Sequence, residues 1–178
     1  SVKRQSGLLQ PEINSSNILG SSLTLPYYKV ISENKDLTLT PTLFNSSTSM
    51  LAAEYRAINP NTKILADVGY VNRYKSTITN ELNSLSHYFI DIDHNLKLDN
   101  YNHSNLQLSL RKVSNDTYLK VFDQHMTKSS LKPEDSNNLN SNLKLFLNHD
   151  EFNFESGIQS FEDLQIKNKS DRYQYNLP

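Results

Sequence analysis

The sequence contains no cysteine and no tryptophan, and it has only four glycines in 178 residues. The lack of cysteine excludes disulfide bonds and thiolate metal sites within this chain. No apolar run approaches the length of about 18 residues that a transmembrane helix needs. The formal net charge is only -1, without a basic block, so the composition gives no sign of a nucleic-acid partner.

Polar, uncharged residues dominate instead, with 22 asparagines and 23 serines. Two explanations stay open: compositional drift in an AT-rich genome, or a protein with many exposed loops and a sheet whose inner face is polar. The two explanations are compatible with each other.

Apolar and polar residues alternate along most of the chain, which is the period of a β-strand. The pattern recurs at 8–14, 19–31, 37–43, 50–57, 64–70, 88–93, 106–111, 142–148 and 152–155. It predicts an all-β protein, an antiparallel up-and-down meander of about nine strands. One face is expected to carry Leu37, Leu39, Leu51, Ala53, Ile64, Val68, Ile90, Ile92, Leu106 and Leu108. The opposite face is expected to carry Thr38, Thr40, Glu54, Arg56, Asp67, Asp91, Asp93 and Arg111.

The predicted connections alternate in length. Short links are expected at 32–35, 59–62, 99–103 and 148–150, and longer loops at 72–87 and 113–138, the second containing a helical turn near 117–124. Short turns at one end and longer loops at the other are typical of transmembrane β-barrels. Soluble β-sandwiches can show the same pattern, so a soluble or surface-exposed, adhesin-like binding module remains the alternative function.

No motif indicates catalysis or a cofactor. The five histidines lack the spacing of metal ligands and are interpreted as turn or strand-end residues. The segment 91–102 begins like a calcium loop but lacks the glycine and glutamate that such a loop needs. Glu54 and Asp67 are a conceivable carboxylate pair, but nothing specifies a substrate. We therefore expect no enzyme, no metal and no cofactor.

Residues 4–71 also closely resemble the start of the outer-membrane barrel of the LptD family of lipopolysaccharide-assembly proteins. The resemblance rests on Arg4 to Leu9, Pro11, Leu25 to Tyr28, Thr38 to Pro41, and Glu54 to Ala57. It is looser at 112–118. Gln5 and Ala57 depart from the family pattern, which often has a basic residue at the first position and usually an aromatic residue at the second.

The resemblance implies that residues 1–178 are a fragment, the first strands of a transmembrane barrel, without the remaining strands and the periplasmic jelly-roll domain. It implies transport of lipopolysaccharide into the outer leaflet of a Gram-negative outer membrane. An LptE-like lipoprotein plug, an LptA-like periplasmic bridge reaching the jelly-roll domain, and outer-membrane lipid are the implied partners. The eight polar residues of the sheet would then face the barrel lumen.

The resemblance implies a barrel that opens laterally between its first and last strands, and Pro11 and Pro26 in the first two strands would mark this gate. A proline donates no hydrogen bond to the sheet, and an unpaired carbonyl in lipid costs on the order of several kcal/mol. We expect the two prolines to lie close together, in the half of the membrane near the short turns. The alternative is that they only shape a bulge or twist.

Loop sidedness gives a first prediction. If the chain enters from the periplasm, 32–35 and 59–62 are periplasmic, whereas 72–87 and 113–138 are extracellular. Residues 1–178 contain no cysteine, so Ser76→Cys and Asn61→Cys each add one thiol to this segment, and labelling is compared with that of the full-length protein without either substitution. Intact cells should be labelled at position 76 and not at position 61, and the reverse pattern would overturn this topology.

Overall fold

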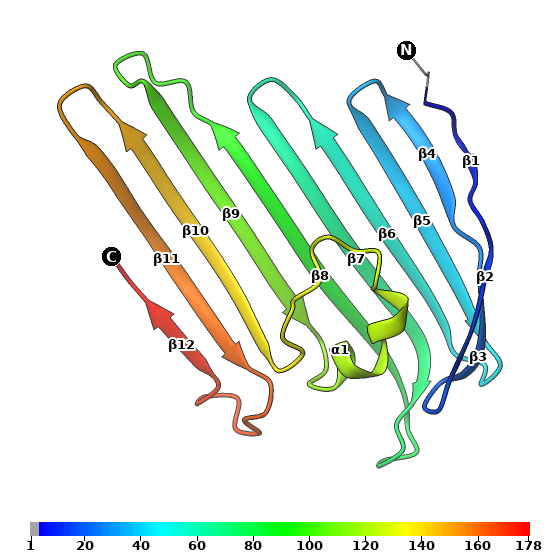
Figure 1. Ribbon diagram of the computed structural model, residues 1–178. Coiled ribbons are helices and arrows are strands. Elements are labelled where there is room, and N and C mark those ends of the chain that lie inside the picture. Colours follow the sequence, from blue (N-terminus) through cyan, green and yellow to red (C-terminus); the bar gives the residue numbers. More distant parts are fainter. Residues whose placement is uncertain (1–3) are drawn as a thin grey trace.

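The computed structural model describes residues 4–178, which form one antiparallel sheet with a single helical segment on it (Figure 1). The strands are β1 (Gly7–Leu8), β2 (Glu12–Ser16), β3 (Gly20–Thr24), β4 (Tyr27–Ser32), β5 (Lys35–Phe44), β6 (Ser49–Ile58), β7 (Thr62–Lys75), β8 (Leu82–Asn95), β9 (His103–Val113), β10 (Asn138–Asn148), β11 (Asn153–Asp163) and β12 (Tyr173–Asn176). The helical segment is α1 (Tyr118–Val121), followed by a 3-10 turn, η1 (Asp123–His125).

The twelve strands confirm the predicted all-β meander, with neighbours in sequence paired in order. We call each crossing of the sheet by the chain a pass. β3 and β4 both pair with β5 and form one interrupted pass, and β1 and β2, which pair with β4 and β3, form another. The chain thus crosses the sheet in ten passes, one more than expected. The extra pass is β12, which the sequence did not predict because 173–176 is short and mostly polar. The sheet is open and does not close into a barrel.

The predicted division into two faces follows from the strand register. Glu54 lies opposite both Thr38 and Asp67, whereas Ala53 lies opposite Leu39 and Val68, so each set shares one face. Within residues 4–178 no second sheet packs on the apolar face, and this segment is therefore not a two-sheet sandwich. Large apolar side chains on that face remain exposed, among them Leu43, Leu51, Tyr70, Tyr88, Leu143 and Ile158.

The connections differ from the expected ones in length. The loop expected at 72–87 is shortened to 76–81, because β7 and β8 continue past an irregularity in their register between Val71 and Tyr74. Arg73 adopts a positive φ of 59° at this point. The loop expected at 113–138 spans 114–137 and contains the predicted helical turn as α1 and η1. The link expected at 99–103 spans 96–102.

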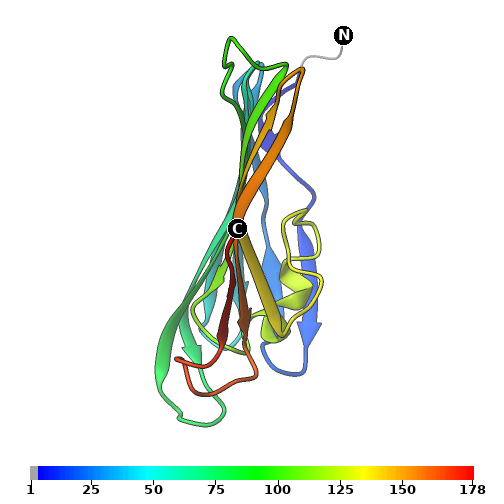
Figure 2. The same cartoon turned by 90° about the vertical axis from the view of Figure 1, so that its left-hand side faces the viewer.

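The sheet is twisted and curved, and the loop 114–137, which we name the inner loop, lies against its concave face (Figure 2). This is the face that carries the eight polar residues. The main hydrophobic core lies between the inner loop and the sheet, where Phe122 and Tyr118 of the loop are fully buried with Phe89 and Val71 of the strands. The ring of Phe122 packs edge-on against Phe44 at 6.4 Å between centroids.

Neither helical segment within residues 4–178 is long and apolar enough to cross a membrane.

The buried position of Phe122 gives a second prediction. Phe122→Ala should cost about 3–5 kcal/mol of local stability, because it removes a fully buried aromatic side chain. Limited proteolysis of the full-length protein should then cut the inner loop much faster. Ile78→Ala is the control, since that side chain is 91% exposed. Equal cleavage of the two variants would show that Phe122 does not hold the loop in place.

Candidate functional site

The first two passes of the sheet are both interrupted near their middle. Residues 9–11 between β1 and β2 and residues 25–26 between β3 and β4 lie outside the regular strands, and each gap keeps only isolated backbone bonds. Leu8 pairs with Tyr27 and Glu12 pairs with Thr24, so three residues of the first pass lie opposite two of the second. An extra residue of this kind is a β-bulge, which bends the strand and interrupts the pairing.

Prolines account for the missing ladder bonds. Leu9 donates its backbone N–H to the carbonyl of Pro26 at 2.8 Å, and Leu25 donates to the carbonyl of Pro41 at 3.1 Å. In an antiparallel pair of this type each residue normally returns the bond, and proline cannot do so. Pro26 therefore leaves the Leu9 carbonyl without its ladder donor, and Pro41 does the same for Leu25.

Pro11 lies in segment 9–11 and Pro26 in the gap opposite it. Their expected place in the periplasmic half of the membrane stays a prediction. Pro26 lies between β3 and β4, which have similar lengths. β4 leads from Pro26 to the short turn, and β3 leads to the opposite end of the sheet. Pro41 was not predicted as part of this region. Its signal was a proline inside the alternating strand pattern at 37–43.

The eight polar residues share the concave face, and several neutralise one another. Arg111 donates from Nη1 to Asp91 Oδ1 at 2.7 Å. Asp93 accepts bonds from Asn105 and Gln107. No group of three or more His, Asp or Glu side chains within the described chain is placed to hold a metal ion. The structure thus brings these residues together as a polar surface, without the convergent geometry of a catalytic or metal centre.

Asp67 is the exception, because it belongs to a buried chain of three polar groups that holds the inner loop. The ring of His87 lies 2.8 Å from Tyr118 Oη through Nδ1 and 3.1 Å from Asp67 Oδ1 through Nε2. His87 and Tyr118 are fully buried. Gly69 makes room for the ring, since a Cβ at that position would lie 2.3 Å from the His87 Cε1 atom.

Sequence reasoning missed this contact. It interpreted every histidine as a turn or strand-end residue, and for His87, buried within β8, that interpretation is wrong. No local pattern marks His87, because its partners lie 20 and 31 residues away in the chain. Only the register that pairs it with Gly69 reveals the space for its ring.

A cavity of about 230 Å³ lies between the inner loop and the first passes of the sheet. Residues 124–129 form one wall, and Leu9, Glu12 and Pro26 contribute to the other. Thus the inner loop faces the interrupted strands directly.

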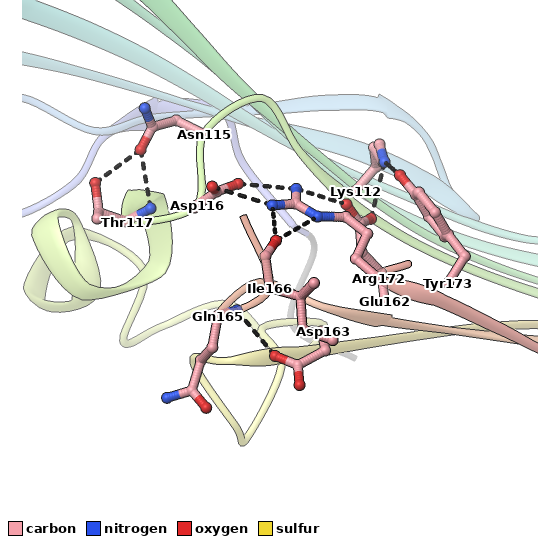
Figure 3. A network of polar contacts seen from close by, with 10 residues as sticks. All are labelled: Lys112, Asn115, Asp116, Thr117, Glu162, Asp163, Gln165, Ile166, Arg172 and Tyr173. Atoms are coloured by element: carbon pink, nitrogen blue, oxygen red, sulfur yellow. Dashed lines mark hydrogen bonds and ion pairs between the residues drawn. The ribbon is translucent and has the colours of Figure 1, made fainter. Parts of the chain in front are cut away.

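A network of four charges fastens the other side of the inner loop (Figure 3). Arg172 holds the carboxylate of Asp116 with both terminal nitrogens, at 2.9 and 3.1 Å. Glu162 accepts a bond from Lys112 at 2.8 Å and lies 3.4 Å from Arg172. Lys112 also donates to the Tyr173 hydroxyl of β12 at 2.6 Å. The two positive and two negative charges balance. The network therefore links the inner loop to the strands beside it and does not form an open anion-binding site.

The pKa of His125, in η1, gives a third prediction. Burial lowers this pKa below its ordinary value of 6.5, and the Glu12 carboxylate opposes the shift more weakly. As pH falls, His125 of an undocked loop therefore takes up its proton at a higher pH than His125 of the docked loop. The contribution of docking is therefore complete above about pH 6.5 and is lost as pH falls towards the lower pKa of the docked histidine.

Hydrogen exchange of the inner loop should consequently be faster at about pH 5, after correction for intrinsic rates, than at about pH 8. His125→Gln should remove this difference, since glutamine does not titrate. An unchanged pH dependence in the variant would assign the effect to other groups.

No family model matches the sequence. Individual relatives do: the chain is 27% identical to the LPS-assembly protein LptD of Cupriavidus necator over 91% of its length. It is 32% identical to LptD of Paraburkholderia xenovorans over 66% of its length, and 27% identical to LptD of Thiobacillus denitrificans over 91%. It spans only 18%, 14% and 20% of the length of these relatives. The chain is therefore similar to one part of LptD proteins, and these similarities support an LptD-like protein.

Proposed function

We propose that the protein takes part in lipopolysaccharide assembly at the outer membrane of a Gram-negative bacterium, and that residues 1–178 are the first strands of its transmembrane β-barrel. The observation that carries this proposal is the similarity, over 91% of the chain, to proteins named for lipopolysaccharide assembly. The role is transport, with no chemical step and no cofactor.

The shape of the sheet supports a place in lipid. A transmembrane strand needs about 9–11 residues, and β5, β6, β9, β10 and β11 have 10 or 11 each. One face carries exposed apolar side chains and the other is polar, as expected of a barrel wall between lipid and an aqueous lumen. Both edges of the sheet need further strands, because an unpaired edge is not tolerated in a bilayer.

The lumen and its partners follow from the same proposal. Thr38, Thr40, Glu54, Arg56, Asp67, Asp91, Asp93 and Arg111 would face the lumen, which an LptE-like lipoprotein occupies as a plug. An LptA-like periplasmic bridge would deliver lipopolysaccharide through a jelly-roll domain outside this segment. Lipopolysaccharide then leaves the barrel sideways into the outer leaflet.

The proposed lateral gate is the first pass of the sheet. Its ladder is interrupted at 9–11, and Pro26 withholds a donor from the same seam. Such a strand separates from its neighbour at lower cost than a continuously paired one, because fewer backbone bonds must break. A bulge that only shapes the barrel remains the alternative role for Pro11 and Pro26.

A matched pair of variants gives the fourth prediction. In the full-length protein, Pro26→Ala restores a backbone N–H opposite the Leu9 carbonyl, between the first and second passes. Pro41→Ala restores one opposite the Leu25 carbonyl, between the second pass and β5. A restored bond contributes about 0.5–1.5 kcal/mol. At about 1.4 kcal/mol the open population falls tenfold. Pro26→Ala should therefore reduce surface lipopolysaccharide more than Pro41→Ala at equal protein level.

The measurement is lipopolysaccharide at the cell surface after depletion of the chromosomal copy, with wild type or variant supplied in trans. Normal surface lipopolysaccharide in depleted cells would refute the proposed function itself. Wild-type export by Pro26→Ala, with depletion still harmful, would leave the function standing and assign the prolines a shaping role.

A further inference from the structure

Few backbone bonds hold the first pass, so its side-chain contacts carry more weight than those of any inner strand. β1 has two residues and β2 has five, and in segment 9–11 between them Leu9 alone keeps a backbone bond to the second pass. On its other side the first pass has no neighbour among the described residues. Two ion pairs reach this pass from elements other than the strand beside it.

The first ion pair lies on the β1 side of segment 9–11. Arg4 donates from Nη1 to Asp36 Oδ2 at 3.0 Å. Arg4 precedes β1 and Asp36 belongs to β5, so the contact crosses over β4, which lies between them in the sheet. The Asp36 side chain is only 4% exposed, and its other oxygen accepts a bond from Arg56 Nε at 2.8 Å. A buried carboxylate fixed in this way is a rigid anchor for Arg4.

The second ion pair lies on the β2 side. Lys128 of the inner loop pairs with Glu12, the first residue of β2. The inner loop is itself fixed to β8 by the bond between Tyr118 and His87 and by the burial of Phe122. Lys128 therefore connects the first pass to the middle of the sheet, across the cavity that separates them.

We propose that these two ion pairs, Arg4 with Asp36 and Glu12 with Lys128, act as clamps that hold the first pass against the sheet on either side of residues 9–11. The inner loop then serves as a strap from the barrel wall to the gate strand. This proposal rests on the lateral gate proposed above and adds what restrains the movement of the gate strand.

The two clamps differ in character. Lys128 is 77% exposed and Glu12 34%, so their attraction is weak and is screened by salt. Arg4 is 56% exposed, but its partner is buried and held from the other side by Arg56. A weak clamp near the inner loop and a firmer one near the short turns would make the β2 end of the first pass release first.

The test measures backbone hydrogen exchange of residues 7–16 in the full-length protein, in which the rate reports local opening. Glu12→Lys and Lys128→Glu each place like charges together and should raise exchange in 12–16 by about fivefold. The double variant restores an opposite pair with reversed signs and should return the rate to that of the wild type. Lys132→Glu is the control, because Lys132 pairs with Asp123 inside the loop.

For the other clamp, Arg4→Glu should accelerate exchange at 7–8, whereas Arg4→Lys, which keeps the charge, should change it little. The clamps are refuted if the single reversals leave exchange at the control level, or if the double variant exchanges as fast as either single one. Hydrogen exchange is measured independently of lipopolysaccharide export. A negative exchange result would therefore refute the clamps without refuting the proposed function. Faster exchange combined with normal surface lipopolysaccharide after depletion would support the clamps and refute the transport role.

Discussion

The continuity of the backbone ladder is the constraint on which the rest of this structure depends. Each inner strand is paired along both sides, which fixes its register and hence the face on which every side chain lies. Among the described strands the first pass combines a bulge with an adjacent proline, so its ladder is interrupted at the edge where the sheet begins. The regular strands form a continuous wall, and the irregular one is the strand that we assign to the proposed gate.

The two faces of the sheet meet different demands. The apolar face carries exposed leucine and tyrosine side chains, which suits contact with lipid tails. On the other face the charges are largely balanced within the sheet, as with Arg111 and Asp91. Over part of this face the inner loop adds a small hydrophobic core of its own, with Phe122 at its centre. A sheet that is otherwise one layer thick thereby gains a second layer next to its interrupted edge.

Local pattern was sufficient for the strands and insufficient for the docked loop. The alternation from Leu37 onward predicts the strands and the face of each side chain, because successive residues of a strand point to opposite faces. The sequence order of these strands predicts the meander. The contact of His87 with Tyr118 depends on register and on a loop returning over the sheet, and neither leaves a local periodic signal. The polar strand β12 was missed because its position depends on pairing with β11 and on the contact of Tyr173 with Lys112. Pro11 and Pro26 were recognisable from the residue type. The observed bond from Leu9 was needed to show that Leu9 is the residue whose carbonyl receives no bond from Pro26.

The pair of Glu12 and Lys128 joins residues 116 positions apart, whereas the strands from β4 to β9 are joined by short links. Contacts between distant residues form late in folding, because a long chain segment must first be closed at an entropic cost. The hairpins from β5 to β9 can form locally, but the inner loop has no surface on which to dock until those strands stand side by side. The segment of the sheet that is synthesised first is therefore among the last to be fixed, and the strand that we assign to the gate is also the one that waits longest for its place during assembly.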